Sequence, residues 1–282
     1  MVTPFNADGS VDFKGLERLT NHLVDGGVNY LVLMGTTGES VTLTKSEKQV
    51  VINNILETNN GRLPVVLGVG GNNTVEVCAQ LESLDTTGLT AVLSVSPAYN
   101  KPTQGGIYAH YAEVSKASPL PIILYNVPGR TGSNMTAETT LRLANDFDNI
   151  VAIKEASGSL DQCTAILKDR PEGFLVISGD DTLSLPIITS GGDGVISVVA
   201  NALPVEYSEL ISASLMGNLA TAQKRQYQLF DLINALFEEG NPAGVKAALD
   251  ILGVCGTEVR LPLLKASETL VSKLKNQLAE MR

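Results

Sequence analysis

The feature that most constrains the fold of this chain is the regular recurrence of short apolar segments rich in β-branched residues. The first residues of successive segments lie 34, 27, 31, 29, 24 and 19 residues apart. Each segment is apolar almost throughout, which is typical of a parallel strand covered on both faces. The segments are Tyr30–Met34, Pro64–Val69, Ala91–Val95, Ile122–Asn126, Val151–Lys154, Leu175–Ser178 and Gly194–Val198.

Amphipathic stretches with helical periodicity separate these segments. Thr44–Asn59 and Thr74–Thr86 are two of them, and Thr44 with Glu47 fits a capping box at a helix start. Seven such units, with a further strand at the chain start, predict an α/β protein of the (β/α)8 TIM-barrel class. A doubly wound open sheet is the alternative, but it usually carries a glycine-rich first turn, and none is visible here.

The two ends of the chain depart from the repeating unit. From Pro204 onward the pattern is helical, with expected helices at Ala220–Glu239, Ala243–Leu252 and Ser267–Met281. We therefore expect a barrel over 1–218 and a C-terminal helical extension packed on it over 219–282. At the other end, Met1–Thr3 leaves a first strand that is truncated: either the true start lies upstream or this strand is very short.

The composition limits the kind of partner. The 282 residues carry a net charge of −10, which argues against nucleic acid and anionic membrane surfaces. No signal peptide and no apolar run near 18 residues is present. Three cysteines without paired spacing are typical of a reduced, cytoplasmic protein. The two histidines lie far apart in the sequence, so we expect no metal site.

Lys154 is the residue with the most specific chemistry. It ends the apolar run Val151–Lys154, where burial favours the neutral amine over the ammonium. A neutral amine attacks a carbonyl carbon and forms a Schiff base. On this segment alone, the alternative is a surface lysine just past a strand and paired with Glu155.

Further polar motifs follow the other expected strands, where barrels carry their active sites. Gly35–Ser40 brings two glycines and two threonine hydroxyls, and Ser96–Pro102 contains Tyr99. Tyr125–Gly132 joins a strand-end tyrosine, suited to proton transfer, to Arg130, suited to gripping a carboxylate. Ser178–Asp181 and Gly194–Ser197 follow the last two strands. Taken singly, each motif also fits an ordinary turn or packing residue.

Together, Gly35–Ser40, Tyr125–Gly132, Val151–Gly158 and Ser178–Asp181 closely resemble the dihydrodipicolinate synthase family. This family belongs to the class I pyruvate aldolases, with N-acetylneuraminate lyase, and the resemblance covers essentially the whole chain. It implies condensation of pyruvate with aspartate 4-semialdehyde on the diaminopimelate route to lysine. It implies no metal or organic cofactor, and a homotetramer built as a dimer of dimers.

The resemblance also assigns roles to individual residues. Lys154 matches the Schiff-base lysine, Tyr125 the proton-shuttling tyrosine, and Thr36 the hydroxyl that links it to Tyr99, which reaches into a neighbouring subunit's site. The resemblance implies that the substrates are held by Thr37, Arg130, Ile196 and Gly179, and that a lysine-effector pocket contains Ser40, Asn72 and Glu76.

Two other functions remain open from the sequence. One is a different Schiff-base pyruvate aldolase of the sugar-acid or N-acetylneuraminate lyase type, in which an arginine at position 130 is unusual. The other is a keto-acid-binding paralogue without turnover, which would carry a broken set of lysine, tyrosine and threonine. In this chain the set is intact.

Overall fold

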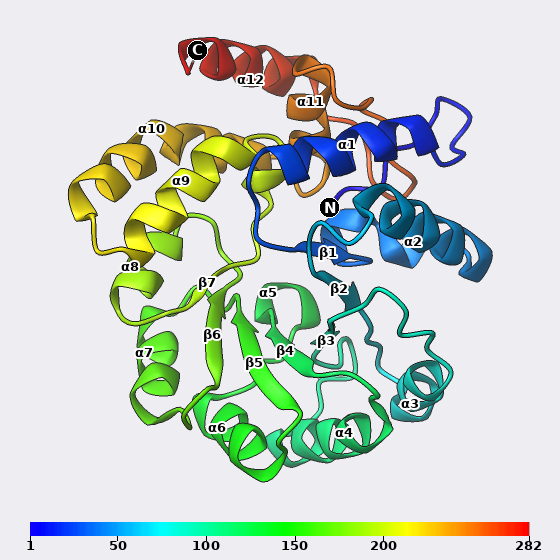
Figure 1. Ribbon diagram of the computed structural model, residues 1–282, viewed down its shortest axis with the longest axis vertical. Helices are drawn as coiled ribbons and strands as arrows, with labels where there is room; N and C mark the ends of the chain where they lie inside the picture. Colours follow the sequence, from blue (N-terminus) through cyan, green and yellow to red (C-terminus); the bar gives the residue numbers. More distant parts are fainter. Residues whose placement is uncertain (282) are drawn as a thin grey trace. The chain divides into compact units, whose positions relative to one another are not determined.

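The computed structural model describes residues 1–281 in two compact units (Figure 1). One unit is Val65–Ile196, and the other combines Met1–Pro64 with Ser197–Arg282. The boundary expected at residue 218 falls in the connection between α9 (Pro204–Leu215) and α10 (Leu219–Phe237). Among the described residues, no helix is both long and apolar enough to span a membrane.

The Val65–Ile196 unit alternates parallel strands with helices. Strand neighbours follow the chain order without reversal, so the doubly wound alternative is wrong, because such a sheet reverses its order at a switch point. β4 is buried throughout, as expected of a strand covered on both faces. The elements of the Val65–Ile196 unit are β2 (Val65–Gly68), α3 (Thr74–Glu82), β3 (Ala91–Val95), α4 (Gln104–Ala117), β4 (Ile122–Asn126), α5 (Pro128–Thr131), α6 (Ala137–Asp146), β5 (Ile150–Glu155), α7 (Leu160–Asp169), β6 (Leu175–Ser178), α8 (Ser184–Thr189) and β7 (Gly194–Val195).

The second unit contains the helices of the two chain ends. The capping box expected at Thr44 is present, since Thr44 Oγ1 accepts from the Glu47 N–H and the Glu47 carboxylate accepts from the Thr44 N–H. The three C-terminal helices agree with their expected ranges to within two residues at each end. The elements are α1 (Phe13–Asp25), β1 (Leu31–Leu33), η1 (Thr36–Gly38), η2 (Ser40–Thr42), α2 (Lys45–Asn59), η3 (Val199–Asn201), α9 (Pro204–Leu215), α10 (Leu219–Phe237), α11 (Ala243–Ile251) and α12 (Glu268–Glu280).

The strand expected at the chain start is not among the seven strands described in residues 1–281. The Met1 amine donates to the Val32 carbonyl at 2.8 Å, but the Val2 N–H donates to the Asn201 side chain at 3.0 Å. Thr3 Oγ1 donates to the Gly38 carbonyl at 2.7 Å. Two of these three bonds involve a side chain, so these residues do not form the continuous backbone ladder that a strand requires.

Candidate active site

Tyr125 and Lys154 are direct neighbours at the carboxyl edge of the parallel sheet. They are register partners, each one residue before the end of its strand. The two strands, β4 and β5, lie side by side in the sheet (Figure 1). Both are buried, with 8% of Tyr125 and 9% of Lys154 exposed. Lys154 Nζ lies 4.4 Å from the centroid of the Tyr125 ring. The structure therefore brings together two of the residues selected from the sequence, at the edge where barrel enzymes carry their chemistry.

The backbone after β6 approaches Lys154 closely. A Cβ added to Gly179 would lie 2.9 Å from Lys154 Cε and 2.6 Å from Ala156 Cβ, so no larger residue fits there. The Gly179 N–H donates to the Glu155 carbonyl at 2.8 Å, and the Ile196 N–H donates to the Ser178 carbonyl at 2.9 Å. Gly179 and Ile196 thus continue the backbone pairing of the edge that carries Lys154.

Glu155 is not the partner of Lys154, so the alternative of a surface ion pair is wrong. Its side chain is almost completely buried and its carboxylate accepts only from neutral donors. Asn126 Nδ2 donates at 3.0 and 3.1 Å, Gln162 Nε2 at 2.8 Å and the Ser157 N–H at 2.7 Å. Because side chains alternate along a strand, Lys154 and Glu155 point to opposite faces.

The Glu155 network fixes the ends of β4 and β5, and sequence reasoning missed it. Asn126 Oδ1 accepts from the Met135 N–H at 2.9 Å, and Asn134 Nδ2 donates to Gln162 Oε1 at 2.8 Å. Four bonds to one buried carboxylate replace its lost hydration. The signal in the sequence was strand alternation, which places the residue after a strand-end lysine inside the opposite layer.

Arg130 and Tyr99 lie in loops beyond the strand ends. Arg130 belongs to α5, a single turn that starts at Pro128, and its exposed guanidinium has no ion pair within residues 1–281. The Tyr99 N–H donates to the Thr131 carbonyl at 3.2 Å, which links the two loops. Tyr99 has a positive φ of 72° and is 89% exposed. The Tyr99 ring is therefore accessible to a second molecule.

Thr36 and Thr37 belong to the other compact unit, where they form η1 immediately after β1. Thr36 is exposed, whereas Thr37 is half-buried and accepts a hydrogen bond from Asn241 Nδ2 at 2.8 Å. Glu39 ends this turn with φ 51°, a left-handed conformation that few residues other than glycine adopt. The surrounding contacts therefore hold this backbone in place.

A fully buried ion pair between Glu39 and Lys246 anchors that turn. Lys246 Nζ donates to Glu39 Oε1 and to the Glu258 carbonyl, each at 2.6 Å, and the Arg260 N–H donates to Glu39 Oε2 at 3.0 Å. Burial lowers the pKa of the Lys246 ammonium, and Glu39 opposes this effect. Both carboxylate oxygens of Glu39 are thus satisfied by residues of the C-terminal segment.

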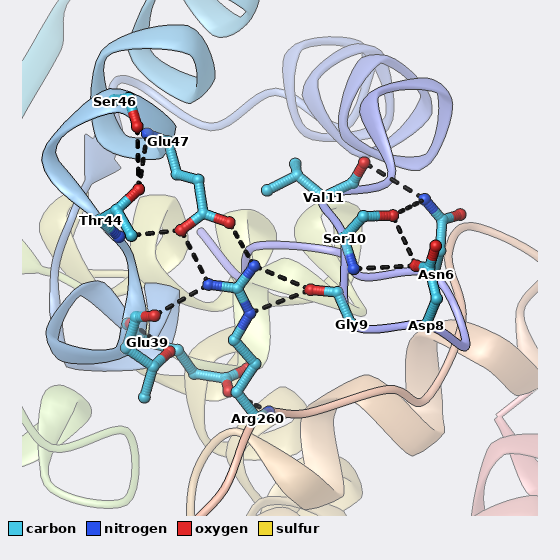
Figure 2. Close-up of polar contacts among 11 residues, drawn as sticks. Asn6, Asp8, Gly9, Ser10, Val11, Glu39, Thr44, Ser46, Glu47 and Arg260 are labelled. Atoms are coloured by element: carbon cyan, nitrogen blue, oxygen red, sulfur yellow. Dashed lines mark hydrogen bonds and ion pairs between the residues drawn. The ribbon is translucent and has the colours of Figure 1, made fainter.

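Arg260 extends the same cluster to the start of α2. Figure 2 shows its guanidinium between Glu47 and the backbone of the Asn6–Val11 turn. It donates to the Glu47 carboxylate, to the Gly9 carbonyl and to the Thr42 carbonyl. These hydrogen bonds lower the pKa of Glu47 to about 2. Sequence reasoning missed this cluster, although a lone lysine inside the apolar run Ala243–Leu252 was a signal for it.

The proposed lysine-effector residues have few contacts of their own. Ser40 is half-buried and begins η2, while Asn72 and Glu76 are exposed at the start of α3 in the other compact unit. Glu76 has no ion pair within residues 1–281. Its carboxylate is therefore able to accept a hydrogen bond from a ligand.

Two of the three cysteines, Cys163 and Cys255, are buried free thiols. Burial raises the pKa of Cys163 to about 12 and that of Cys255 to about 11, so both remain protonated thiols. In residues 1–281 no group of three or more histidine, cysteine, aspartate or glutamate side chains is placed to hold a metal ion.

Several known proteins are similar to this chain in sequence and fold over nearly its whole length. The 4-hydroxy-tetrahydrodipicolinate synthase of Flavobacterium psychrophilum is 52% identical over 97% of this chain and 94% of its own length. Among solved structures, the chloride-inhibited dihydrodipicolinate synthase of Acinetobacter baumannii, complexed with pyruvate, is 40% identical with a TM-score of 0.95, over 99% of this chain and 96% of that one. The dihydrodipicolinate synthase of Cyanidioschyzon merolae, solved with lysine bound, is 40% identical with a TM-score of 0.94, over 99% of this chain and 95% of that one.

These likenesses define first the fold class and then the family. Solved structures that superpose over the whole chain with a TM-score of 0.95 establish an α/β fold of the TIM-barrel type with C-terminal helices. The profile of the Dihydrodipicolinate synthetase family matches residues 1–281. This chain therefore belongs to the Dihydrodipicolinate synthetase family.

Proposed function

We propose that this chain is a lyase that condenses pyruvate with L-aspartate 4-semialdehyde to give 4-hydroxy-tetrahydrodipicolinate, in the diaminopimelate route to lysine. The observation that carries the proposal is the buried Lys154 amine, 4.4 Å from the centroid of the Tyr125 ring at the carboxyl edge of the sheet. Family membership supports the choice of substrates. We further propose that the enzyme works in the cytoplasm as a homotetramer, with a barrel over 1–218 and a C-terminal extension over 219–282.

The proposed reaction begins with imine formation. The Lys154 amine attacks the keto carbon of pyruvate, and loss of water gives a protonated imine. The imine withdraws electrons, so the methyl group loses a proton and an enamine forms. The enamine carbon attacks the aldehyde carbon of the second substrate, and the aldehyde oxygen takes up a proton. The amino group of that substrate then attacks the imine carbon, which closes the ring and releases the Lys154 amine.

We assign proton transfer in these steps to Tyr125, whose ring lies beside the Lys154 amine. A tyrosine hydroxyl both donates and accepts protons, as the imine and enamine steps require. By the family resemblance, Thr36 and Tyr99 complete the relay, with Tyr99 supplied by a neighbouring subunit. The exposed ring of Tyr99 supports this assignment.

Substrate carboxylates are assigned to two further side chains. Thr37, with its backbone N–H, is proposed to bind the pyruvate carboxylate. Arg130 is proposed to bind the carboxylate of the semialdehyde, because its guanidinium is exposed and unpaired within residues 1–281. By the family resemblance, the backbones of Gly179 and Ile196 are also assigned to substrate binding. A lysine-effector pocket formed by Ser40, Asn72 and Glu76 completes the proposal.

Borohydride trapping tests this function. The purified protein is incubated with pyruvate, reduced with borohydride and mapped by peptide mass spectrometry, and the expected adduct lies on Lys154. Consumption of aspartate semialdehyde is then measured with pyruvate present, beside cleavage of N-acetylneuraminate. An adduct without semialdehyde consumption but with sugar-acid cleavage would select the lyase alternative. No adduct at all would overturn the Schiff-base function.

A further inference from the structure

Asn241 donates a hydrogen bond to the side chain of Thr37. Asn241 Nδ2 lies 2.8 Å from Thr37 Oγ1, and only 8% of Asn241 is exposed. A threonine hydroxyl has one proton and two lone pairs. Because the oxygen accepts from the amide here, its own proton remains to be donated elsewhere. No acceptor for that proton lies within residues 1–281.

Tight helix packing fixes Asn241 in place. It precedes α11, and α11 begins against the end of α10 without room for a side chain at Gly244. A Cβ added there would lie 2.3 Å from the Leu236 carbonyl oxygen. The Gly240 N–H donates to the Phe237 carbonyl at 3.0 Å, which sets the turn just before Asn241. These contacts hold in place the backbone on either side of Asn241.

The Thr37 turn is anchored independently of Asn241. Two residues further on, Glu39 is held by Lys246 of α11 and by the Arg260 N–H. The turn is thus held through the Glu39 carboxylate, whereas the Asn241 amide contacts only the hydroxyl of Thr37. Loss of the Asn241 amide should change the direction of the Thr37 proton and leave the turn itself in place.

We propose that Asn241 is a positioning residue that sets the Thr37 hydroxyl as a hydrogen-bond donor to the carboxylate of the keto-acid substrate. The inference rests on the proposed function, in which Thr37 binds that carboxylate. A carboxylate only accepts hydrogen bonds, so it requires a donor at this point. A residue at 241 that accepted from Thr37 would take the proton that the substrate needs.

Asn241→Asp tests the direction of this hydrogen bond, because aspartate has the same shape but only accepts. The Thr37 proton then turns to the aspartate, and the KM for pyruvate should rise about 10- to 100-fold, the loss expected for a hydrogen bond to a charged group. The KM for the semialdehyde and kcat at saturating pyruvate should stay within about threefold. A general loss of structure would lower kcat instead.

Three further variants complete the test. Asn234→Asp makes the same charge change on the exposed face of α10 and should leave both KM values unchanged. Asn241→Ala removes the amide without adding charge, so the freely rotating hydroxyl should raise the pyruvate KM by about threefold to tenfold. This variant also carries the test if Asn241→Asp does not fold. In a Thr37→Val background, Asn241→Ala should have no further effect on the pyruvate KM.

Two outcomes separate this inference from the proposed function. A wild-type protein that forms no borohydride-trapped pyruvate adduct contradicts the function itself. A wild-type protein that forms the adduct, with Asn241 variants that keep the wild-type pyruvate KM, overturns only the role of Asn241.

Discussion

Lys154 Nζ lies 4.4 Å from the centroid of the Tyr125 ring, and the two residues face each other in the register of β4 and β5. Both side chains are more than nine-tenths buried. The pairing of two parallel strands therefore sets the spacing between the Lys154 amine and the Tyr125 ring, and no loop has to hold them. An active site on strands is held more precisely than one on loops.

Removal of the Lys154 amine should abolish covalent capture of pyruvate. We expect Lys154→Ala to form no borohydride-trapped adduct and to lose turnover by about 1,000-fold or more. Lys154→Arg should not restore activity, because a guanidinium stays protonated. Lys168→Ala, an exposed lysine of α7, is the matched control and should retain both properties. Adduct formation on any other lysine would contradict the assignment.

Arg130 should affect the second substrate far more than the first. Charge-assisted hydrogen bonds contribute roughly 1.5–3 kcal/mol each, so Arg130→Ala should raise the KM for the semialdehyde by about 10- to 100-fold. The rate of imine formation with pyruvate should stay near wild type. Arg142→Ala removes another exposed arginine of the same compact unit and serves as the control. Equal damage to both half-reactions would indicate a structural role for Arg130.

Tyr99 should make the activity of one subunit depend on its association with a neighbouring subunit. If its hydroxyl completes the site of a neighbouring subunit, Tyr99→Phe should lower turnover by about tenfold or more, while sedimentation shows unchanged association. Tyr227→Phe, which alters a tyrosine that is 75% exposed on α10, should have no effect on turnover. Unchanged turnover in Tyr99→Phe, or full activity in a dilute monomer, would remove the catalytic role.

The Arg260–Glu47 contact should make stability depend on acid pH. Hydrogen bonds from Arg260 lower the pKa of Glu47 from 4.5 to about 2 in the folded protein. The unfolded chain thus binds the proton first, so the stabilisation is complete above pH 4.5 and is lost as pH falls towards 2. Glu47→Gln, which keeps the capping box, should cost about 1–2 kcal/mol at pH 6 and progressively less below pH 4.5.

Urea unfolding of wild type and Glu47→Gln between pH 6 and pH 2.5 measures this difference. Glu57→Gln, an exposed change later in α2, is the control and should follow the wild-type curve. A constant difference between wild type and Glu47→Gln at all pH values would show that ionisation of Glu47 does not contribute.

Feedback by lysine should be weak in this protein. By the family resemblance, Lys45 and Lys48 stand where lysine-sensitive relatives carry imidazole or smaller polar groups, and their charges oppose a cationic ligand. Ala98 stands where those relatives carry an aromatic ring, which removes contact worth about 0.5–2 kcal/mol. A lysine titration of initial rates checks this, and half-inhibition well below millimolar would contradict it. Ala98→Tyr should strengthen the inhibition.

The strand positions were predictable from the sequence. Periodic apolar segments located all seven strands, because a buried parallel strand has to be apolar on both faces. The ends of those strands then selected Lys154 and Tyr125, since parallel strands bring their carboxyl ends to one edge. The capping box at Thr44 was visible because it depends on four consecutive residues alone.

Long-range partners were decided only by the tertiary structure. Nothing local to Lys246 indicates that its ammonium lies 2.6 Å from Glu39 Oε1, 207 residues away. Likewise, Asn241 resembled an ordinary helix entry, and only the folded chain places its amide on Thr37. The apolar pattern of a strand depends on residues that are neighbours in the sequence. The partner of a buried polar group depends instead on which distant segment of the chain packs beside it.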